Sequence, residues 1–406
     1  MLRLFRGWSL YAVPLPLRLT VWLFAWLLKS MNVTMQRWLL AAGCCAALSG
    51  CATSDGGDAG RAGLSAGDSR ALIARLLPPG TSDRAGWATD IYAAFATQDI
   101  AATPENFCAV LAVTEQESTF RADPPVPGLA AIAWQEIDKQ AERAGVPKFA
   151  VHAALRLPSS NGKSYSDRID AVTTEKQLSE IFEDFIGMVP LGKTFLASRN
   201  PVRTGGPMQV SVAFAETHAS AHQYPYPITH SIRHEVFTRR GGMYFGIAHL
   251  LGYDAPYAQP LYRFADFNAG RYASRNAAFQ NALTLASGVP LILDGDLLPP
   301  GAAADTPTGS TELAALALAK RLDMAAPAIR RDLEHGTEPT FERTRLYERV
   351  FARAEQASGR PVPRAVLPNI KLKSPKITRN LTTEWFARRV DDRYQRCVSR
   401  ARLQDS

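Results

Sequence analysis

The chain has 406 residues, of which 46% are hydrophobic and 21% are charged. This composition excludes a disordered protein, a collagen-like fibre and a small disulfide scaffold, and the length suffices for two or three domains. The formal net charge is +8, but residues 1–50 contribute +5 and residues 336–406 contribute +8, which leaves −5 for residues 51–335. Because the positive excess lies at the two ends, the charge gives no support for nucleic-acid binding.

Residues 35–51 are typical of an export signal. Arg37 supplies the positive start, and residues 38–48 form an apolar stretch of signal-peptide length that is too short to span a membrane. The tetrad LSGC at 48–51 resembles the lipobox of bacterial lipoproteins, in which the cysteine receives a diacylglycerol and the preceding peptide is removed. The resemblance implies that Cys51 is a lipidated N-terminus. By resemblance to known lipoproteins, the alanine that follows it, in place of an aspartate, implies anchoring in the outer membrane, facing the periplasm.

Residues 1–30 contain a second apolar stretch that is interrupted by prolines. Two export signals in tandem are unusual, so we interpret Met31 or Met35 as the true start of translation. On this interpretation residues 1–50 are a leader. Residues 51–68, which are rich in Gly, Ser, Ala and Asp, are then a flexible tether to the membrane.

Cys108 and Cys397 are the two cysteines that neither leave with the leader nor carry the lipid. In an exported chain two such cysteines either pair or remain as buried thiols, and the sequence leaves both possibilities open. A disulfide between them would tie the last helix of the chain to the helix that bears Cys108.

The mature chain is predicted to be mainly helical, with no internal repeat and little alternation of apolar and polar residues. The clearest helix starts after Thr103, which suits an N-cap, has Pro104 at its first position and should end near residues 118–120. Further helices are expected, in chain order, at residues 71–77, 84–96, 131–144, 174–186, 241–251, 258–282, 311–322, 326–335, 340–357 and 382–402. Loops or extended segments are expected at residues 159–169 and 189–206, and a linker at residues 301–310.

Three short segments, in order, carry residues suited to sugar chemistry. EQESTF at 115–120 closes the helix after Thr103, GGPMQV at 205–210 follows a loop, and FADFNAG at 264–270 lies within a later predicted helix. They resemble three motifs of the lysozyme-like lytic transglycosylases: a Glu-Ser-x-Phe helix end, a Gly-Leu-Met-Gln loop and an Ala-Tyr-Asn-Ala-Gly helix. GIAHLL at 246–251 is a fourth, weaker likeness. The chain also looks like a family of proteobacterial lipoproteins of unknown function.

The resemblance implies a mainly α, lysozyme-like domain over about residues 69–300 that cleaves the MurNAc–GlcNAc bond of peptidoglycan without a cofactor. In such enzymes one glutamate protonates the glycosidic oxygen. It then accepts the proton of the muramyl 6-hydroxyl, which closes on C1 to give a 1,6-anhydro sugar. Glu117 matches this catalytic residue. The other matching positions would line the cleft, with the asparagine opposite the glutamate: Ser118, Met208, Gln209, Phe267 and Asn268.

The residues around Glu117 favour the same role. A carboxyl group stays protonated near neutral pH where burial in apolar surroundings raises its pKa. Glu117 follows Val110 and Val113 at helical spacing on a partly apolar side of its helix, whereas Glu115 points about 200° away from it. This mechanism needs no second carboxylate, unlike that of the two-carboxylate glycosidases.

The chain departs from the family pattern in the spacing of its motifs. Glu117 and Gln209 are 92 positions apart, whereas the family has about twenty residues between the corresponding positions. An insertion over about residues 125–200 must therefore leave the cleft or form one of its walls. Pro207 also replaces the leucine that precedes Met208 in the family.

The third motif differs at its aromatic residue. Phe267 stands where relatives have a tyrosine that hydrogen-bonds the catalytic acid. Loss of that hydroxyl could lower activity, or Tyr262 or Tyr272 could supply another one.

Two other functions stay open. His218 and His222 are four residues apart, as are His230 and His234, and such pairs share a helix face and could bind zinc, although no His-Glu-x-x-His motif is present. In this segment the run Tyr-Pro-Tyr-Pro at 224–227 could instead form a rigid aromatic wall on which a sugar stacks. Alternatively, the basic tail from Arg343 to Arg402, within the basic helical extension at 311–406, could bind anionic peptidoglycan, lipid headgroups or a partner without catalysis. Metal ligands are not assigned.

Overall fold

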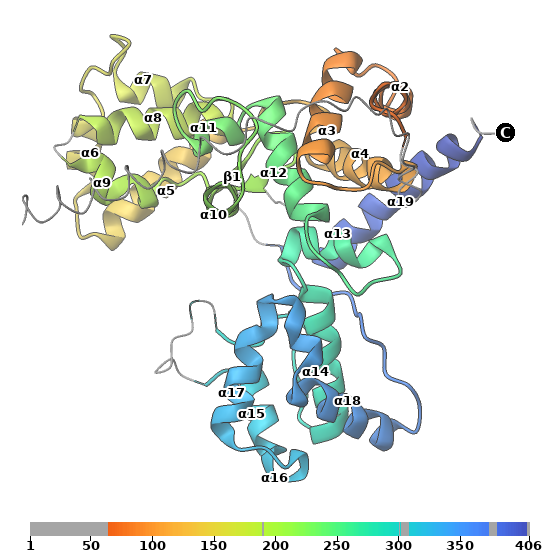
Figure 1. Ribbon diagram of the computed structural model, residues 1–406. Coiled ribbons are helices and arrows are strands. Elements are labelled where there is room, and N and C mark those ends of the chain that lie inside the picture. The colour runs from red at the N-terminus through yellow and green to blue at the C-terminus, as the bar shows by residue number, and fades with distance from the viewer. Residues whose placement is uncertain (1–63, 189–190, 300, 302–307, 373–379, 404–406) are drawn as a thin grey trace, which may run out of the picture. The chain divides into compact units, whose positions relative to one another are not determined.

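The computed structural model describes residues 64–188, 191–299, 301, 308–372 and 380–403. The leader, the lipidation site Cys51 and the tether up to residue 63 therefore lie outside the described residues. The described part is mainly helical, as predicted, with a single two-stranded sheet (Figure 1). None of the helices in these ranges is long and apolar enough to cross a membrane.

The first core is built around α4 (Pro104–Ser118), in which every side chain from Phe107 to Thr114 is buried. A helix that is apolar on all sides must be surrounded by other elements. The helices that bury it or extend its apolar cluster are α2 (Ala66–Leu76), α3 (Arg84–Thr97), α12 (Arg239–Leu251), α13 (Pro260–Ala269) and α19 (Thr383–Arg402).

The start of α4 follows the sequence prediction. The side chain of Thr103 accepts a hydrogen bond from the Asn106 N–H at 3.2 Å, and Pro104 occupies the first turn. Such an N-cap stabilises a helix by about 1 kcal/mol. The helix ends at Ser118, because Thr119 and Phe120 take left-handed backbone conformations with φ of 52° and 58°.

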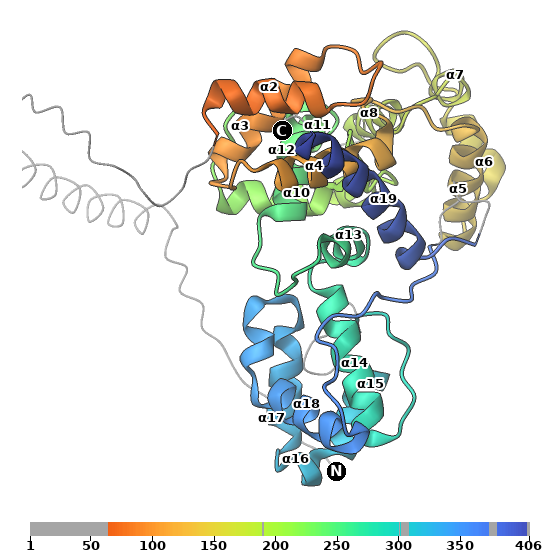
Figure 2. The same cartoon turned by 90° about the vertical axis from the view of Figure 1, so that its right-hand side faces the viewer.

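Helix α19 packs in the first core although it ends the chain. Phe386, Val390 and Cys397 are buried in the same cluster as α4, and Figure 2 shows α19 running past α4 and α13. The predicted C-terminal extension therefore contributes to two cores, because its earlier helices belong to the second one.

The second core consists of α14 (Ala273–Ser287), α15 (Ser310–Ala317), α16 (Ala319–Leu322), α17 (Ala326–Glu334) and α18 (Arg345–Ser358). Helix α18 buries Leu346, Tyr347, Val350, Phe351 and Ala354 along one stripe and packs against α14. The 3₁₀ turns His335–Thr337 and Pro339–Arg343 precede α18, so the helix predicted from residue 340 begins at residue 345 instead.

The helix predicted over residues 258–282 is wrong in one respect, because the structure divides it into α13 and α14. Gly270 adopts a φ of 112°, and Tyr272 a φ of 67°, so the chain changes direction between them. The carboxylate of Asp266 accepts hydrogen bonds from the N–H groups of Tyr272 and Ser274 at 2.9 and 2.7 Å. This side chain caps the new helix, which a local apolar pattern does not reveal.

An inserted lobe with its own small core separates α4 from the hairpin. It contains α5 (Leu129–Arg143), α6 (Lys148–Ala154), α7 (Tyr165–Asp170), α8 (Glu175–Gly187) and α9 (Gly192–Leu196). Helices α7 and α9, with the 3₁₀ turn Ala197–Arg199, lie in segments that were expected to be loops. The lobe occupies the predicted insertion.

The sheet is a hairpin in which β1 (Thr204–Gly205) pairs antiparallel with β2 (Val210–Ser211). Helices α10 (Val212–Ala221) and α11 (Ile232–Val236) follow it and lead into α12. Neither α10 nor α11 was predicted from the sequence.

Candidate functional site

Glu117 lies in the last turn of α4 and is partly exposed. The following residue, Ser118, is buried, and its hydroxyl donates a hydrogen bond to the carbonyl oxygen of Thr114 at 3.1 Å. Phe120 packs edge-on against Trp87, with 5.4 Å between the ring centres. The left-handed residues after Ser118 therefore turn the chain back into the core and leave Glu117 at the exposed end of the helix.

The second motif forms the tip of the hairpin. Gly206 has a φ of 73°, and a Cβ there would lie 2.1 Å from the carbonyl oxygen of Val236. Gln209 also has a positive φ, 50°, and its side-chain amide donates to the Gly206 carbonyl oxygen at 3.3 Å. Thr204 donates to the Gln209 side-chain oxygen at 3.4 Å. The tight turn thus fixes Gln209, which stays partly exposed.

Both motifs pack on α12. The hydroxyl of Thr114, one turn before Glu117, contacts the sulfur of Met243 at 3.8 Å. Met208 is fully buried against Gly246, where a Cβ would lie 2.5 Å from its sulfur. Met243 and Gly246 are successive-turn neighbours on α12. The end of α4 and the hairpin, 92 positions apart in sequence, are therefore placed beside each other on one helix.

The third motif lies at the other end of α12. The ring of Phe267 packs against His249 with 5.1 Å between ring centres, and the Nε2 atom of His249 lies 3.3 Å from the Phe267 carbonyl oxygen. His249 is six residues beyond Met243, or about 9 Å along the helix axis. Asn268 is exposed and accepts a hydrogen bond from the Thr383 hydroxyl at 3.1 Å, at the start of α19. The placement of Asn268 opposite Glu117 stays a prediction.

Two tyrosines form hydrogen bonds to Asp266, which belongs to the third motif. Tyr257 and Tyr253 donate to its carboxylate at 2.7 and 3.1 Å, in addition to the backbone N–H groups that it caps. Burial raises the pKa of Asp266, and these hydrogen bonds oppose that change. The sequence analysis missed Asp266, and its position four residues before a glycine was the one available signal. Tyr272, a candidate replacement for the missing hydroxyl, is buried against Tyr253 instead.

A patch of aromatic and histidine side chains adjoins this motif. The ring centre of Phe214 lies 5.6 Å from that of His218 and 4.7 Å from that of His249. The Arg271 guanidinium lies 4.9 Å from the centre of the Phe214 ring. Burial, with the neighbouring Arg271 charge, lowers the pKa of His249 from 6.5 to about 4. Burial, together with the nearby charges of His222 and Arg271, also lowers the pKa of His218 from 6.5 to about 4. Both imidazoles are therefore neutral at pH 7.

The histidine pairs lie on separate elements. The ring of His218 on α10 stacks on that of His222, directly after the helix, with 4.2 Å between centres, and His230 and His234 lie 4.8 Å apart around the start of α11. Within the described ranges no group of three or more His, Cys, Asp or Glu residues is placed to hold a metal ion. Tyr224 stacks on Phe245 rather than facing solvent with its ring.

The inserted lobe is tied to the first core through α11. Within the lobe, the Val126 N–H donates a hydrogen bond to the Thr173 carbonyl oxygen at 2.9 Å. Near the hairpin, the Arg233 guanidinium of α11 lies 3.6 Å from the Glu183 carboxylate of α8. The lobe thus begins and ends next to Glu117 and the hairpin, which places its ends at the border of the candidate site.

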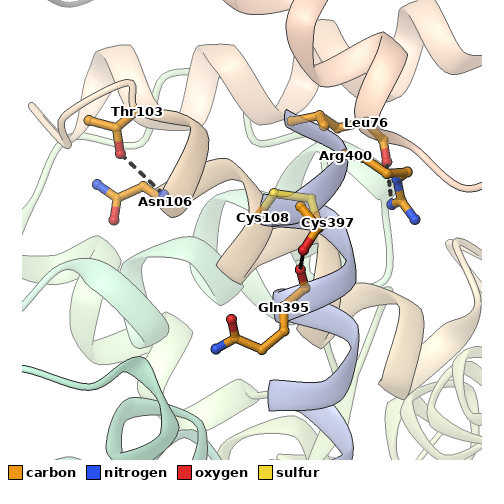
Figure 3. Close-up of a disulfide and its surroundings, with 8 residues drawn as sticks. Leu76, Thr103, Asn106, Cys108, Gln395, Cys397 and Arg400 are labelled. Atoms are coloured by element: carbon orange, nitrogen blue, oxygen red, sulfur yellow. Dashed lines mark hydrogen bonds between the residues drawn. A yellow bond between two sulfur atoms is a disulfide. The ribbon is translucent and has the colours of Figure 1, made fainter. Parts of the chain in front are cut away.

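A disulfide joins Cys108 and Cys397, so the first of the two possibilities left open by the sequence holds in the structure (Figure 3). It connects α4 to α19, and the Arg400 side chain adds a hydrogen bond to the carbonyl oxygen of Leu76 at 3.1 Å. Near the other end of α4, Arg393 of α19 pairs with Glu115 at 3.5 Å. Glu115 therefore faces α19, which agrees with its expected separation from Glu117 around the helix.

The chain matches one protein family and one bacterial relative. Residues 80–400 match the family described as "Protein of unknown function (DUF1615)", and the chain belongs to this family. It is 56% identical over 331 residues to "Uncharacterized protein YaiW" of Escherichia coli (strain K12), which covers 82% of this chain and 90% of that protein. No solved structure matches the chain.

Proposed function

We propose that the protein is a lytic transglycosylase, anchored in the outer membrane, that cleaves the MurNAc–GlcNAc bond of peptidoglycan. The main support is the meeting of the Glu117 helix end and the Met208–Gln209 hairpin on α12, despite the inserted lobe between them. The order of elements, a helix end, a hairpin, a helix and a helix that ends in Asn-Ala-Gly, is the order that the lysozyme-like resemblance implies.

In the proposed reaction the Glu117 carboxyl group gives its proton to the glycosidic oxygen as the bond from that oxygen to C1 breaks. The resulting carboxylate takes the proton of the muramyl 6-hydroxyl, whose oxygen bonds to C1. Glu117 thus ends protonated, no water is consumed and no cofactor is needed. Gln209, fixed by the hairpin and partly exposed, is the group proposed to orient the sugar, whereas the buried Ser118 holds the helix end through its bond to Thr114.

Strained backbone supports a functional role for these segments. Left-handed conformations of non-glycine residues cost about 1–3 kcal/mol and concentrate at functional sites. Thr119, Phe120 and Gln209 adopt them in the two motifs that meet on α12. In addition, the side-chain oxygen of Gln116 is buried without a hydrogen-bond partner in the chain, next to Glu117. Such atoms are uncommon in folded proteins.

Murein digestion by Glu117→Gln tests the proposal, with Glu115→Gln as the matched control. Both changes remove one carboxylate from the same helix end, but only Glu117 has the proposed catalytic role. We expect the first to release soluble muropeptides at least 100-fold more slowly than wild type, since loss of a general acid costs that much. The control should keep most of the activity. Equal rates for Glu117→Gln and wild type would refute the role.

The membrane anchor is part of the proposal and has its own test. If Cys51 carries a diacylglycerol, a radiolabelled fatty acid should be incorporated into the wild-type protein and the protein should fractionate with the outer membrane. Cys51→Ala should lose the label completely. Label retained by the variant would exclude Cys51 as the lipidated residue.

A non-catalytic wall-binding lipoprotein is the second candidate. Phe267 in place of the family's tyrosine favours it, as does the exposed face of α19, which presents Arg388, Arg389 and Arg396. Sedimentation of folded protein with purified murein, without release of products, is the outcome that this function predicts.

A further inference from the structure

The outer side of α6, in the inserted lobe, is apolar and faces solvent. Phe149 is 78% exposed and Leu157 is 52% exposed. The Leu157 N–H donates to the Ala154 carbonyl oxygen at 3.2 Å, so the chain keeps turning past the end of α6. Phe149, the exposed Ala153 and Leu157 are spaced four residues apart, as on one helix face. Exposed apolar side chains that share a face mark an interaction surface.

The opposite side of α6 packs within its own lobe, against α5 (Figure 2). Leu155 is buried in the core of the lobe. The ring of His152 lies 4.7 Å from that of Trp134, and its Nε2 atom lies 2.8 Å from the Asp138 carboxylate. The core of the lobe is therefore closed without Phe149, whose exposure leaves it available to a partner outside the lobe.

Basic side chains surround this apolar face. Residues 139–163 carry five basic side chains and one acidic side chain, a net charge of +4. Because residues 51–335 together carry −5, the remainder of that stretch carries −9. A basic patch in an otherwise acidic part of the chain attracts an anionic partner. All five of its basic residues are exposed: Lys139, Arg143, Lys148, Arg156 and Lys163.

Apolar and cationic side chains together favour the surface of an anionic bilayer over other anionic partners. Phe149 and Leu157 would enter the boundary of the acyl chains, where apolar side chains leave water. Lys148 and Arg156 would stay at the headgroups, because long basic side chains keep their charged ends in water. A hydrated wall polymer offers a partner to the cations but leaves the apolar side chains in water.

The lipid anchor would bring such a bilayer close to the folded part of the chain. Leu64, the first described residue, follows Cys51 by thirteen residues. A segment of this length spans at most about 45 Å when it is fully extended. A second contact with the same membrane is then intramolecular, and its effective concentration is high. A weak contact surface suffices under these conditions.

We propose that the outer side of α6 docks on the anionic leaflet that holds the lipid of Cys51. This docking rests on the lipid anchor of the proposed function and goes beyond it. The anchor limits the distance between the folded part and the bilayer, whereas a second contact also fixes the orientation. The inserted lobe then keeps one face of the protein turned toward the membrane.

Spin labelling of the mature lipidated protein tests the docking. Cys108 and Cys397 are paired and Cys51 carries the lipid, so Phe149→Cys supplies the free thiol for a nitroxide. The control label is on Leu313→Cys, at an exposed position of α15. In vesicles of phosphatidylethanolamine and phosphatidylglycerol, we expect a water-soluble nickel chelate to reach the label at 149 roughly threefold less than the control, because the label is in the interface. Equal accessibility of the two labels would overturn the proposal.

The charge dependence is tested in the same labelled chain. Lys148→Glu/Arg156→Glu should raise the nickel accessibility at position 149 to that of the control label, and so should vesicles of phosphatidylcholine alone, because both remove the electrostatic attraction. Lys320→Glu/Arg321→Glu, which changes two exposed cations of α16, should leave it unchanged. An unchanged melting temperature shows that each variant is folded. Protection that does not depend on either charge would overturn the assignment to an anionic surface.

Other occupants of this face give different results. Protection of the label only after purified murein is added would assign the face to the wall, and dipolar broadening between labels in detergent micelles would assign it to a second copy of the chain. Either result would overturn the docking. Labelling of the wild-type protein at Cys51 would refute the anchor and, with it, the docking. Glu117→Gln should leave the protection unchanged, which separates this test from the catalytic one.

Discussion

The first and second cores differ in the number of their strained backbone residues and of their unpaired buried polar groups. Among the described residues, the first core and its hairpin contain left-handed non-glycine residues at Asp83, Asp99, Thr119, Phe120 and Gln209, whereas the second core has Asp323 and, at the start of α14, Tyr272. Aspartate tolerates this conformation better than a β-branched residue such as threonine. Left-handed residues are therefore more frequent in the first core, and in the second core Tyr272 lies at the junction with α13.

Unsatisfied polar atoms follow the same division. Among the described residues, buried side-chain atoms without a hydrogen-bond partner in the chain are in the first core and the elements on it, at Gln98, Gln116, His218 and His249, and in the inserted lobe at Tyr165; the buried Arg393 Nε is in the ion pair with Glu115. No such atom occurs in the described residues of α14 to α18. Since a native fold normally pairs these groups, the two cores differ in how completely their buried polar atoms are satisfied within the chain.

The largest expected effect concerns the disulfide, which ties the first core across 289 residues of sequence. Cys108→Ala/Cys397→Ala should lower the free energy of unfolding by roughly 4 kcal/mol, because a long closed loop restricts the unfolded chain. Hydrogen exchange should show reduced protection in α4 and α19 and little change in α14 and α18. Equal loss of protection in both cores would show that they unfold together and would remove the energetic basis of the comparison.

Protonation of His249 should lower the free energy of unfolding by about 3 kcal/mol in acid. Its pKa is lowered from 6.5 to about 4, so the unfolded chain binds more protons than the folded one between these values. The stabilisation is complete above pH 6.5 and is lost as the pH falls toward 4. His249→Gln, which keeps a donor for the Phe267 carbonyl oxygen, should flatten this part of the pH–stability curve. His230→Gln, at an exposed position, should not.

The smallest expected effect tests the strain itself. Thr119→Gly should raise the free energy of unfolding by about 1 kcal/mol, because glycine takes a φ of 52° without steric cost. Asp323→Gly in the second core should give no gain, since aspartate is less strained there. Chemical denaturation of both variants measures the difference. A loss of stability in Thr119→Gly would contradict the account of strain at the helix end.

The sequence predicted those features that depend on neighbouring residues. Thr103 and Pro104 mark the start of α4 correctly, and the insertion between Glu117 and Gln209 is a separate lobe. The break between α13 and α14 was missed because Asp266 caps the second helix through tertiary contacts with two tyrosines. Short helices such as α7, with six residues, have too little periodicity to stand out from a loop.

The sequence predicted the candidate site only in part as well. The helix end and the hairpin were predicted as motifs, but their meeting on α12 depends on Met208 filling the space beside Gly246. The contact of Phe267 with His249 joins two different helices, and no local pattern indicates it.

The central claim is that Glu117 acts on the sugar and that the first core is a transglycosylase. The most direct test is mass spectrometry of the soluble products from murein incubated with the full-length wild-type protein. The account predicts muropeptides with 1,6-anhydro ends, one water lighter than hydrolysed products. Folded protein that sediments with the wall and releases no products would contradict it.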